Sequence, residues 1–235
     1  MNIIDTIILI LIGVSVLAAV YRGAVYAGLS LGISVLSLVL SLLLCSPLAA
    51  LFKSRSGIYD SLLFYFEGHE YISKSSVELS HAAASGTDEK TLDTILANAD
   101  MPHPFSEKVR KNILSLAYEQ EEVYSLGDYF NKTIVDVVLN ILAAVLLFFL
   151  LRLLCGFLLS AADYSREGFR CLKEYDRLIS FGTGLLHGIL LVFIVFMLCP
   201  VLLGVVPEAG TFLSESVFGS FFYNANPLLL CIPSV

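Results

Sequence analysis

The sequence predicts an all-α integral membrane protein with four transmembrane helices. Of its 235 residues, 57% are hydrophobic and only 15% are charged, a balance far from that of a soluble globular chain. The apolar residues gather in four stretches, each long enough to cross the bilayer core as a helix. None of the four alternates polar with apolar residues as a barrel strand does. The expected spans are Ile3–Val20, Ala24–Phe52, Ile134–Leu151 and Leu178–Val206.

The first span is expected to be retained and to pair with the second. A cleaved signal peptide begins with basic residues, whereas here Asp5 stands where Lys or Arg would be expected. Only Tyr21, Arg22 and Gly23 separate the two spans, so the two helices must run antiparallel. We therefore expect residues 1–52 to form a transmembrane hairpin.

One face of the second span consists of small residues that recur at spacings of three and four. Small side chains let helix backbones approach closely in lipid, and serines can bond across the interface. A contact surface between helices is the favoured interpretation, and a hydroxyl-lined path for water or a solute is the alternative. The stripe consists of Gly23, Ala27, Ser30, Ser34, Ser37 and Ser41.

The polar stretch 53–131 is expected to be a small helical insert rather than an independent enzyme. Residues 87–100 open with acids, which suit a helix N-terminus. A second helix is expected to begin after Ser106 as its N-cap, with Val109 and Ile113 on its apolar stripe.

A second transmembrane hairpin is expected over 132–206, with a connection at 161–177. Asp136 and Asn140 lie one helical turn apart near the first end of the third span. The remaining residues, 207–235, mix phenylalanines with polar residues and are too short and too polar to span. We expect them to form an amphipathic helix along the membrane interface.

The fourth span carries polar and small residues where a plain span would have leucine. Gly184 and Gly188 form a G-x-x-x-G pair, which favours close helix packing. His187 is expected to be a neutral histidine that bonds to Thr183 or to a serine of the second span. A proton relay is the alternative, and the long apolar stretch leaves His187 either near the midplane or at the interface.

Basic residues predict the orientation. They cluster in 161–177 and at Arg22, whereas acids outnumber bases in 53–131. The positive-inside rule places the basic connections in the cytoplasm. Both termini and the insert are then expected outside the cytoplasm.

No motif indicates an enzyme, a cofactor or nucleic-acid binding. The G-x-S-x-G match at Gly28–Gly32 lies in an apolar helix, whereas the nucleophile elbow needs a strand-to-helix turn. A serine protease that paired Ser30 or Ser34 with His187 would also need oxyanion donors and a third residue to orient the histidine, and the sequence identifies neither. No phosphate-binding loop, metal-ligand spacing or basic aromatic patch is present. The expected partners are the lipid bilayer and either a second copy of the chain or other membrane proteins.

Three short motifs follow one another along the chain. They are an Asp near the start of the first span, an Arg-Gly pair after it, and an Asp-Arg pair followed by spaced glycines at the start of the last span. Their residues are Asp5, Arg22, Gly23, Asp176, Arg177, Gly184 and Gly188. In their order and spacing these motifs resemble the colicin V production protein family of bacterial inner-membrane proteins. His187 stands where that family usually carries Arg or Lys.

The resemblance implies a non-enzymatic membrane protein that supports toxin production or export, or envelope homeostasis. It also implies the interfacial register for His187, because Arg at the midplane costs several kcal/mol. The alternative function is a small channel or transporter. Its polar path would be lined by the serines of the second span, Asp136, Asn140 and His187.

Overall fold

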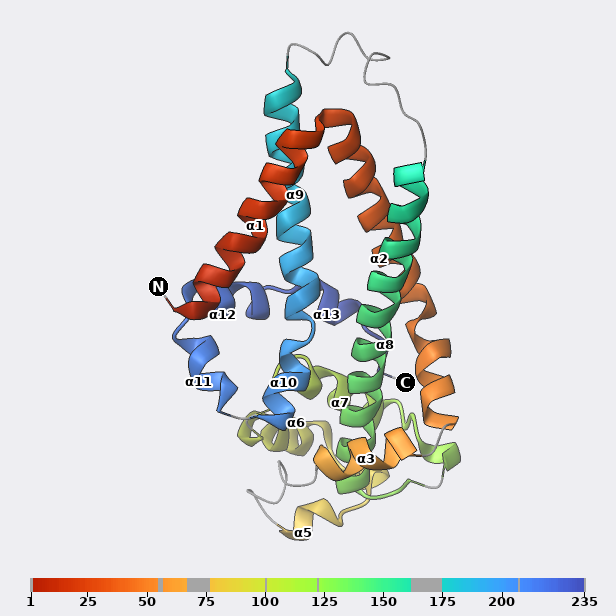
Figure 1. Ribbon diagram of the computed structural model, residues 1–235. Helices are drawn as coiled ribbons and strands as arrows, with labels where there is room; N and C mark the ends of the chain where they lie inside the picture. The colour runs from red at the N-terminus through yellow and green to blue at the C-terminus, as the bar shows by residue number, and fades with distance from the viewer. Residues whose placement is uncertain are drawn as a thin grey trace. The chain divides into compact units, whose positions relative to one another are not determined.

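The computed structural model describes residues 2–54, 57–66, 77–99, 101–121, 123–161, 175–206 and 208–234 (Figure 1). Over these ranges the chain is helical, and the only extended pairing is an isolated bridge between Ala83 and Ser125. Four helical segments are long and apolar enough to cross a membrane, which confirms the all-α class and the number of predicted spans. They are Ile3–Arg22, Ala24–Ser54, Leu126–Ser160 and Asp176–Val205.

The chain divides into two compact units. Unit 1 comprises Met1–Leu44, Ala144–Cys199 and Glu208–Leu228. Unit 2 comprises Cys45–Ala143, Pro200–Pro207 and Leu229–Val235. Helices α2 (Ala24–Ser54) and α8 (Leu126–Ala161) each contribute to both units, so the division falls inside helices. The predicted connection 161–177 lies mostly outside the described residues, which omit 162–174.

Helix α1 (Ile3–Arg22) and α2 form the antiparallel hairpin that their short connection requires (Figure 1). At 1.5 Å per residue, the 20 residues of α1 extend about 30 Å, the thickness of a bilayer core. Gly23 makes the turn with φ +89°, a backbone conformation that residues other than glycine rarely adopt.

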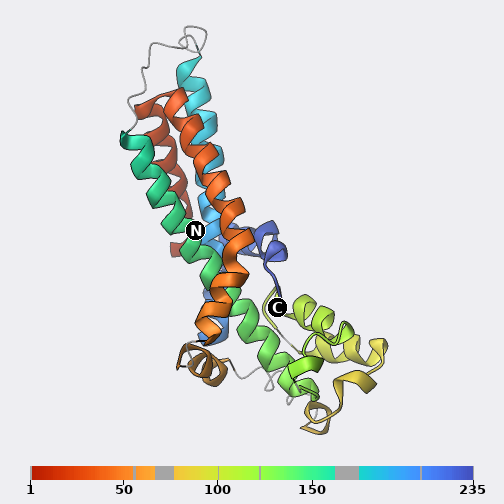
Figure 2. The same ribbon diagram turned by 90° about the vertical axis from the view of Figure 1, so that its right-hand side faces the viewer.

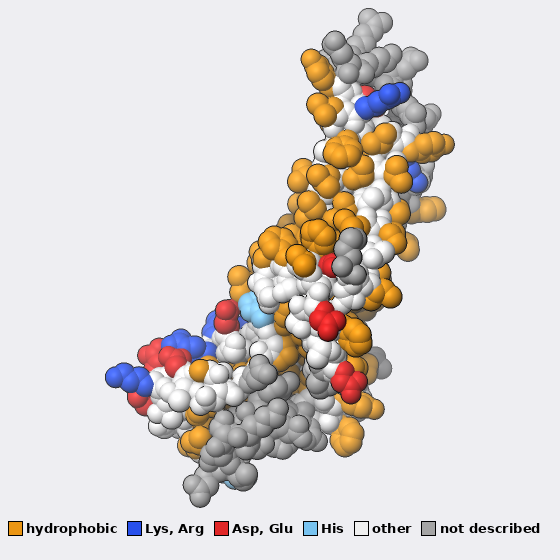
Figure 3. Space-filling view, turned by 90° about the vertical axis from the view of Figure 1, so that its left-hand side faces the viewer, with side chains coloured by type: hydrophobic (Ala, Val, Ile, Leu, Met, Phe, Trp, Pro, Cys, Tyr) orange, Lys and Arg blue, Asp and Glu red, His pale blue; other side chains and the backbone are white. Residues whose placement is uncertain are grey.

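Helix α2 buries its small-residue face. Ser34 is 0% exposed and Ser37 is 1% exposed, whereas the neighbouring Leu36 is 55% exposed. Leucines and valines thus occupy the outward side of the helix, as a lipid-facing surface requires. In Figure 3, hydrophobic side chains likewise cover much of the visible face along the long helices.

In unit 1, α1 packs along α9 (Asp176–Phe196), and the unit 1 parts of α2 and α8 run beside them (Figures 1 and 2). Leu38, Phe148 and Ile194 form a buried apolar cluster from α2, α8 and α9. The fourth span is interrupted after Phe196 and resumes as α10 (Cys199–Val205). Pro200 explains the break, because it has no N–H to donate to the Phe196 carbonyl.

The C-terminal tail forms three short helices in place of the single amphipathic helix predicted. These are α11 (Ala209–Ser214), α12 (Val217–Asn224) and α13 (Pro227–Cys231). Ser216 has an extended backbone and separates α11 from α12. Its Oγ caps α12 by accepting a hydrogen bond from the Gly219 N–H at 2.9 Å. Helix α12 packs on α1 and α9, and the ring centroids of Phe222 and Phe193 are 5.0 Å apart.

Unit 2 contains the shorter helices of the polar stretch. These are α3 (Gly57–Tyr65), α5 (Val77–Ser80), α6 (Glu89–Asn98) and α7 (Phe105–Leu114), with 3-10 turns at Ala84–Gly86 and Glu119–Glu121. The predicted helix in 87–100 is present as α6. The predicted N-cap at Ser106 is wrong, because α7 already begins at Phe105, whose fully buried ring anchors the first turn.

Candidate functional site

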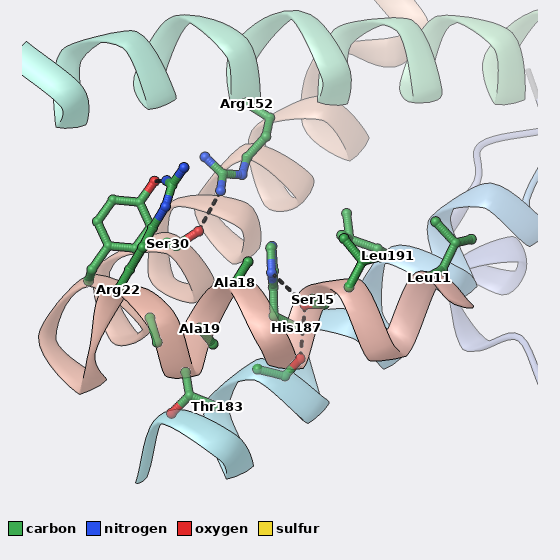
Figure 4. A pocket seen from close by; sticks show the side chains of 14 residues that line it. Leu11, Ser15, Ala18, Ala19, Arg22, Ser30, Arg152, Thr183, His187 and Leu191 are labelled. Atoms are coloured by element: carbon green, nitrogen blue, oxygen red, sulfur yellow. Dashed lines mark hydrogen bonds between the residues drawn. The ribbon is translucent and has the colours of Figure 1, made fainter. Parts of the chain in front are cut away.

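His187 is half-buried where α1, α2 and α9 of unit 1 meet. Its Nδ1 is 3.2 Å from Ser15 Oγ of α1, and its Nε2 is 2.9 Å from Ser34 Oγ of α2. A neutral imidazole donates from one nitrogen and accepts at the other, so these two hydroxyls engage both sides of the ring. The partner in α2 is therefore Ser34, while Thr183 lines the adjoining pocket (Figure 4).

The two spaced glycines of α9 face the backbone of α1. A Cβ at Gly184 would lie 2.7 Å from Ala19 Cβ and 2.9 Å from Val16 Cα. A Cβ at Gly188 would lie 3.0 Å from Ile12 Cα. Only glycine permits this approach, which also brings Ser15 Oγ within 2.9 Å of the Gly184 carbonyl.

The Asp-Arg pair of the third motif separates into one inward and one outward residue. Asp176 Oδ1 accepts from the backbone N–H of Ala24 at 2.9 Å, so the start of α9 is joined to the start of α2. The Asp176 carboxylate also lies beside Gly23. Arg177 is exposed.

Asp5 joins α1 to the C-terminal tail. Its Oδ1 accepts from Ser216 Oγ at 2.6 Å and from the Phe218 N–H at 3.0 Å. Its Oδ2 accepts from the Asn2 N–H at 3.0 Å. Asp5 is only 2% exposed, and these three donors compensate the burial of its charge.

The other small residues of α2 differ in their hydrogen bonds. Ser30 Oγ accepts from Arg152 Nη2 of α8 at 2.5 Å. Ser41 Oγ donates to the Leu38 carbonyl at 2.8 Å. Among the described residues, the buried Ser37 hydroxyl and that of Ser180 in α9 have no hydrogen-bond partner.

A pocket of about 270 Å³ opens between α1, α2, α8 and α9. The guanidinium groups of two arginines belong to its lining. Arg152 points into it from α8 and Arg22 from the hairpin turn (Figure 4). Arg22 bonds to the Tyr26 hydroxyl and lies over its ring, with 4.6 Å from Cζ to the ring centroid.

The two polar residues predicted near the start of the third span lie in unit 2. Asp136 is fully buried, with Oδ1 2.7 Å from Lys53 Nζ and Oδ2 accepting from the Tyr118 hydroxyl at 3.0 Å. Asn140 Nδ2 donates to the Pro233 carbonyl at 3.2 Å. Burial, followed by the nearby negative charge of Asp136, raises the pKa of Tyr118 above its usual value.

A buried polar network around α7 was not predicted from the sequence. Asn112 Nδ2 lies 3.2 Å from the Tyr118 hydroxyl and 3.1 Å from Thr133 Oγ1, and Ser234 Oγ donates to Asn112 Oδ1 at 2.8 Å. Lys108 Nζ donates to the carbonyls of the chain end near Ile232. Both α7 residues share the stripe of Val109 and Ile113, and this spacing was the available signal.

The residues of the predicted polar path therefore fall into two sets. His187 and the serines of α2 belong to unit 1, and Asp136 and Asn140 belong to unit 2. Among the described residues, no three His, Cys, Asp or Glu side chains gather as a metal site would require.

Comparison with known proteins finds no matching family model, no matching curated protein and no matching solved structure. The fold therefore establishes only the class of the protein, which is a helical protein with four segments long and apolar enough to cross a membrane.

Proposed function

We propose that the chain is a non-enzymatic, multi-pass protein of the bacterial inner membrane, of the colicin V production type. It supports production or export of a peptide toxin, or envelope homeostasis, through its packed helices and through protein partners.

The observation that carries this proposal is the use of the motif residues as helix contacts. Asp5 holds the tail helix α12, Asp176 holds the start of α2, and Gly184 and Gly188 admit the backbone of α1. These four of the seven motif residues thus join helices within unit 1, whereas Arg177 is exposed. Such a role suits a protein whose function depends on a specific membrane architecture rather than on a reaction centre.

The surroundings of His187 support the non-enzymatic part of the proposal. Ser34 Oγ is at a distance typical of a nucleophile and its base, but its one proton is donated to the Ser30 carbonyl at 2.9 Å and not to the ring. The second ring nitrogen faces the Ser15 hydroxyl, where a catalytic triad would have a carboxylate.

The proposed membrane placement puts α1 across the bilayer core, with its Arg22 end toward the cytoplasm. Ser15 lies seven residues before Arg22, or about 10 Å along the helix. The Ser15 contact of His187 then lies inside the hydrocarbon, which supports the deeper of its two registers. Cysteine labelling at Ser165 and Ser85, with native thiols removed, tests the orientation: opposite sidedness supports it, and labelling of both from outside contradicts it.

The proposed partner surface is the outward face of α2. Gly28 and Gly32 form a second G-x-x-x-G pair, and a Cβ at either would meet no described atom within 4 Å. Because the inward small face of α2 is already occupied, its outward face is the part of α2 that is open to a second copy or another membrane protein. Crosslinking in the membrane should capture a complex that Gly32→Leu reduces and Gly57→Leu, outside the spans, does not.

The export role is tested by deleting the gene in its host and measuring peptide-toxin secretion and sensitivity to envelope stress. Wild-type chain should restore both, and Asp176→Ala should restore them poorly. Gly182→Ala is the control, because Gly182 has open space around it. Unchanged secretion and unchanged stress sensitivity in the deletion strain would contradict the proposal.

A small channel or transporter is the second candidate. The buried hydroxyls of Ser37 and Ser180, which lack partners among the described residues, support it because such groups commonly bind ordered water. Flux of ions or small solutes in proteoliposomes that Ser34→Leu or His187→Leu abolishes would favour this candidate. Wild-type flux no greater than in empty liposomes would reject it.

A further inference from the structure

We propose that the pocket between Arg22 and Arg152 binds the phosphate of an anionic phospholipid headgroup, with the acyl chain lying along its apolar end. This inference requires insertion of the helices in a bilayer, but it does not depend on the export role.

Among the residues that the structure describes, the pocket holds positive charge without a matching carboxylate. Within the described ranges, no Asp or Glu oxygen lies within ion-pair distance of either guanidinium. Their side-chain acceptors there are the neutral hydroxyls of Ser30 and Tyr26. Arg152 is half-buried, and burying a charge is costly unless an opposite charge or hydrogen bonds compensate it. Arg22, which is exposed, adds a second positive charge at the mouth of the same pocket.

The guanidinium groups have donors left for such an anion. Each arginine carries five N–H donors in a planar fork. The hydrogen bonds described for Arg152 and Arg22 engage one nitrogen of each. Planar forks of this kind suit bidentate bonds to phosphate oxygens, and Ser15 and Thr183 add hydroxyls along the pocket wall.

The lining of the pocket changes from cationic to apolar along α1. Arg22 lies at the hairpin end, whereas Leu11 lies eleven residues earlier, about 16 Å along the helix. Val14 and Leu191 accompany Leu11, as Figure 4 shows for the leucines. A free phosphate would use only the cationic end, whereas a phospholipid matches both ends. This gradient is why we assign the site to a lipid.

The test measures thermal unfolding of the purified full chain in neutral detergent. Short-chain phosphatidylglycerol, phosphatidylcholine and inorganic phosphate are added in separate titrations. Phosphatidylglycerol should raise the unfolding midpoint with increasing concentration, because a ligand that binds only the native state stabilises it. Phosphatidylcholine, whose choline cancels the charge, and inorganic phosphate should have much smaller effects.

Matched variants locate the site. Arg22→Gln and Arg152→Gln should each weaken the apparent affinity for phosphatidylglycerol about tenfold or more. Arg177→Gln removes the same charge from an exposed position in the first turn of α9 and should leave the affinity unchanged. Arg152→Lys keeps the charge and should retain part of the affinity. Arg22 is exposed, so its variant remains informative if Arg152→Gln fails to fold.

Three results would overturn the proposal. One is an equal response to phosphatidylglycerol and phosphatidylcholine, or no response to either. Another is an equal loss of affinity in Arg177→Gln and the two pocket variants. The third is a response to inorganic phosphate as strong as that to the lipid, which would assign the site to a free anion. None of these readouts involves secretion, so failure of the export role is distinguishable from failure of this site.

Discussion

The carboxylate of Asp176 accepts a hydrogen bond from the backbone N–H of Ala24 at 2.9 Å. The two residues are 152 positions apart in the chain. The bond satisfies one of the N–H groups that the start of α2 leaves without a helical partner. It fixes α9 to the hairpin turn, beside the glycine that makes the turn possible.

Replacing Asp176 by Ala should lower the free energy of unfolding by about 1 kcal/mol, the usual cost of losing a helix-capping side chain. The measurement is chemical unfolding in detergent, with Arg177→Ala as the control because its side chain is exposed. Equal stabilities of the two variants would mean that the Asp176–Ala24 bond contributes nothing measurable.

Alanine substitutions along α9 should separate packed glycines from open ones. Gly184→Ala should destabilise the protein by about 1–3 kcal/mol, because the new methyl group would meet the α1 backbone. Gly182→Ala meets open space and should be neutral or stabilising by up to about 1 kcal/mol, since alanine favours helix. Thermal unfolding of both variants checks this, and a stable Gly184→Ala variant would refute the close approach of α1 and α9.

Two serines of α2 should respond differently to removal of the hydroxyl group. Ser34→Ala leaves a ring nitrogen of His187 without its partner and should cost about 1–3 kcal/mol. Ser37→Ala removes a buried hydroxyl that has no partner among the described residues, so it should be neutral or stabilising. The unfolding midpoints in detergent decide this. A larger loss at Ser37 than at Ser34 would indicate a water-bound polar track instead.

Much of unit 1 could be predicted from the sequence because its signals are local and periodic. The length of the apolar stretches predicted the four spans, and the small residues at spacings of three and four predicted the buried face of α2. Bonds between distant segments could not be predicted. Asp5 and Ser216, or Lys53 and Asp136, have no shared pattern that would reveal their pairing. The break of the last span after Phe196 could not be predicted either, because a proline at position 200 is compatible with both a kink and the end of a helix.

Lys108 should contribute stability that rises with pH in the range below the ordinary lysine pKa of 10.5. Burial, and then repulsion by Lys111, lowers the pKa of its ammonium below 10.5. The unfolded chain therefore binds more protons than the folded one between these two pKa values, so the free energy of unfolding increases with pH in that window. Lys108→Met should remove the increase.

The measurement is the unfolding midpoint of wild type and of Lys108→Met as the pH rises toward 10.5, the ordinary lysine value. Cysteines and tyrosines titrate in both proteins, so the difference between the two slopes reports Lys108. Lys90→Met is the control, because Lys90 is exposed. A slope unchanged in Lys108→Met, or reduced equally in Lys90→Met, would show that Lys108 is not responsible.

The central claim is that lipid surrounds these helices while their small and polar residues contact one another. Spin labels on single cysteines at Leu36 and Ser37, in liposomes, test it most directly, because these neighbours share a depth but differ in exposure, at 55% and 1%. The account predicts high access of lipid-dissolved oxygen at 36, low access at 37, and no access of a water-soluble relaxation agent at either. Equal oxygen access at both positions, or strong access of the aqueous agent at 36, would contradict it.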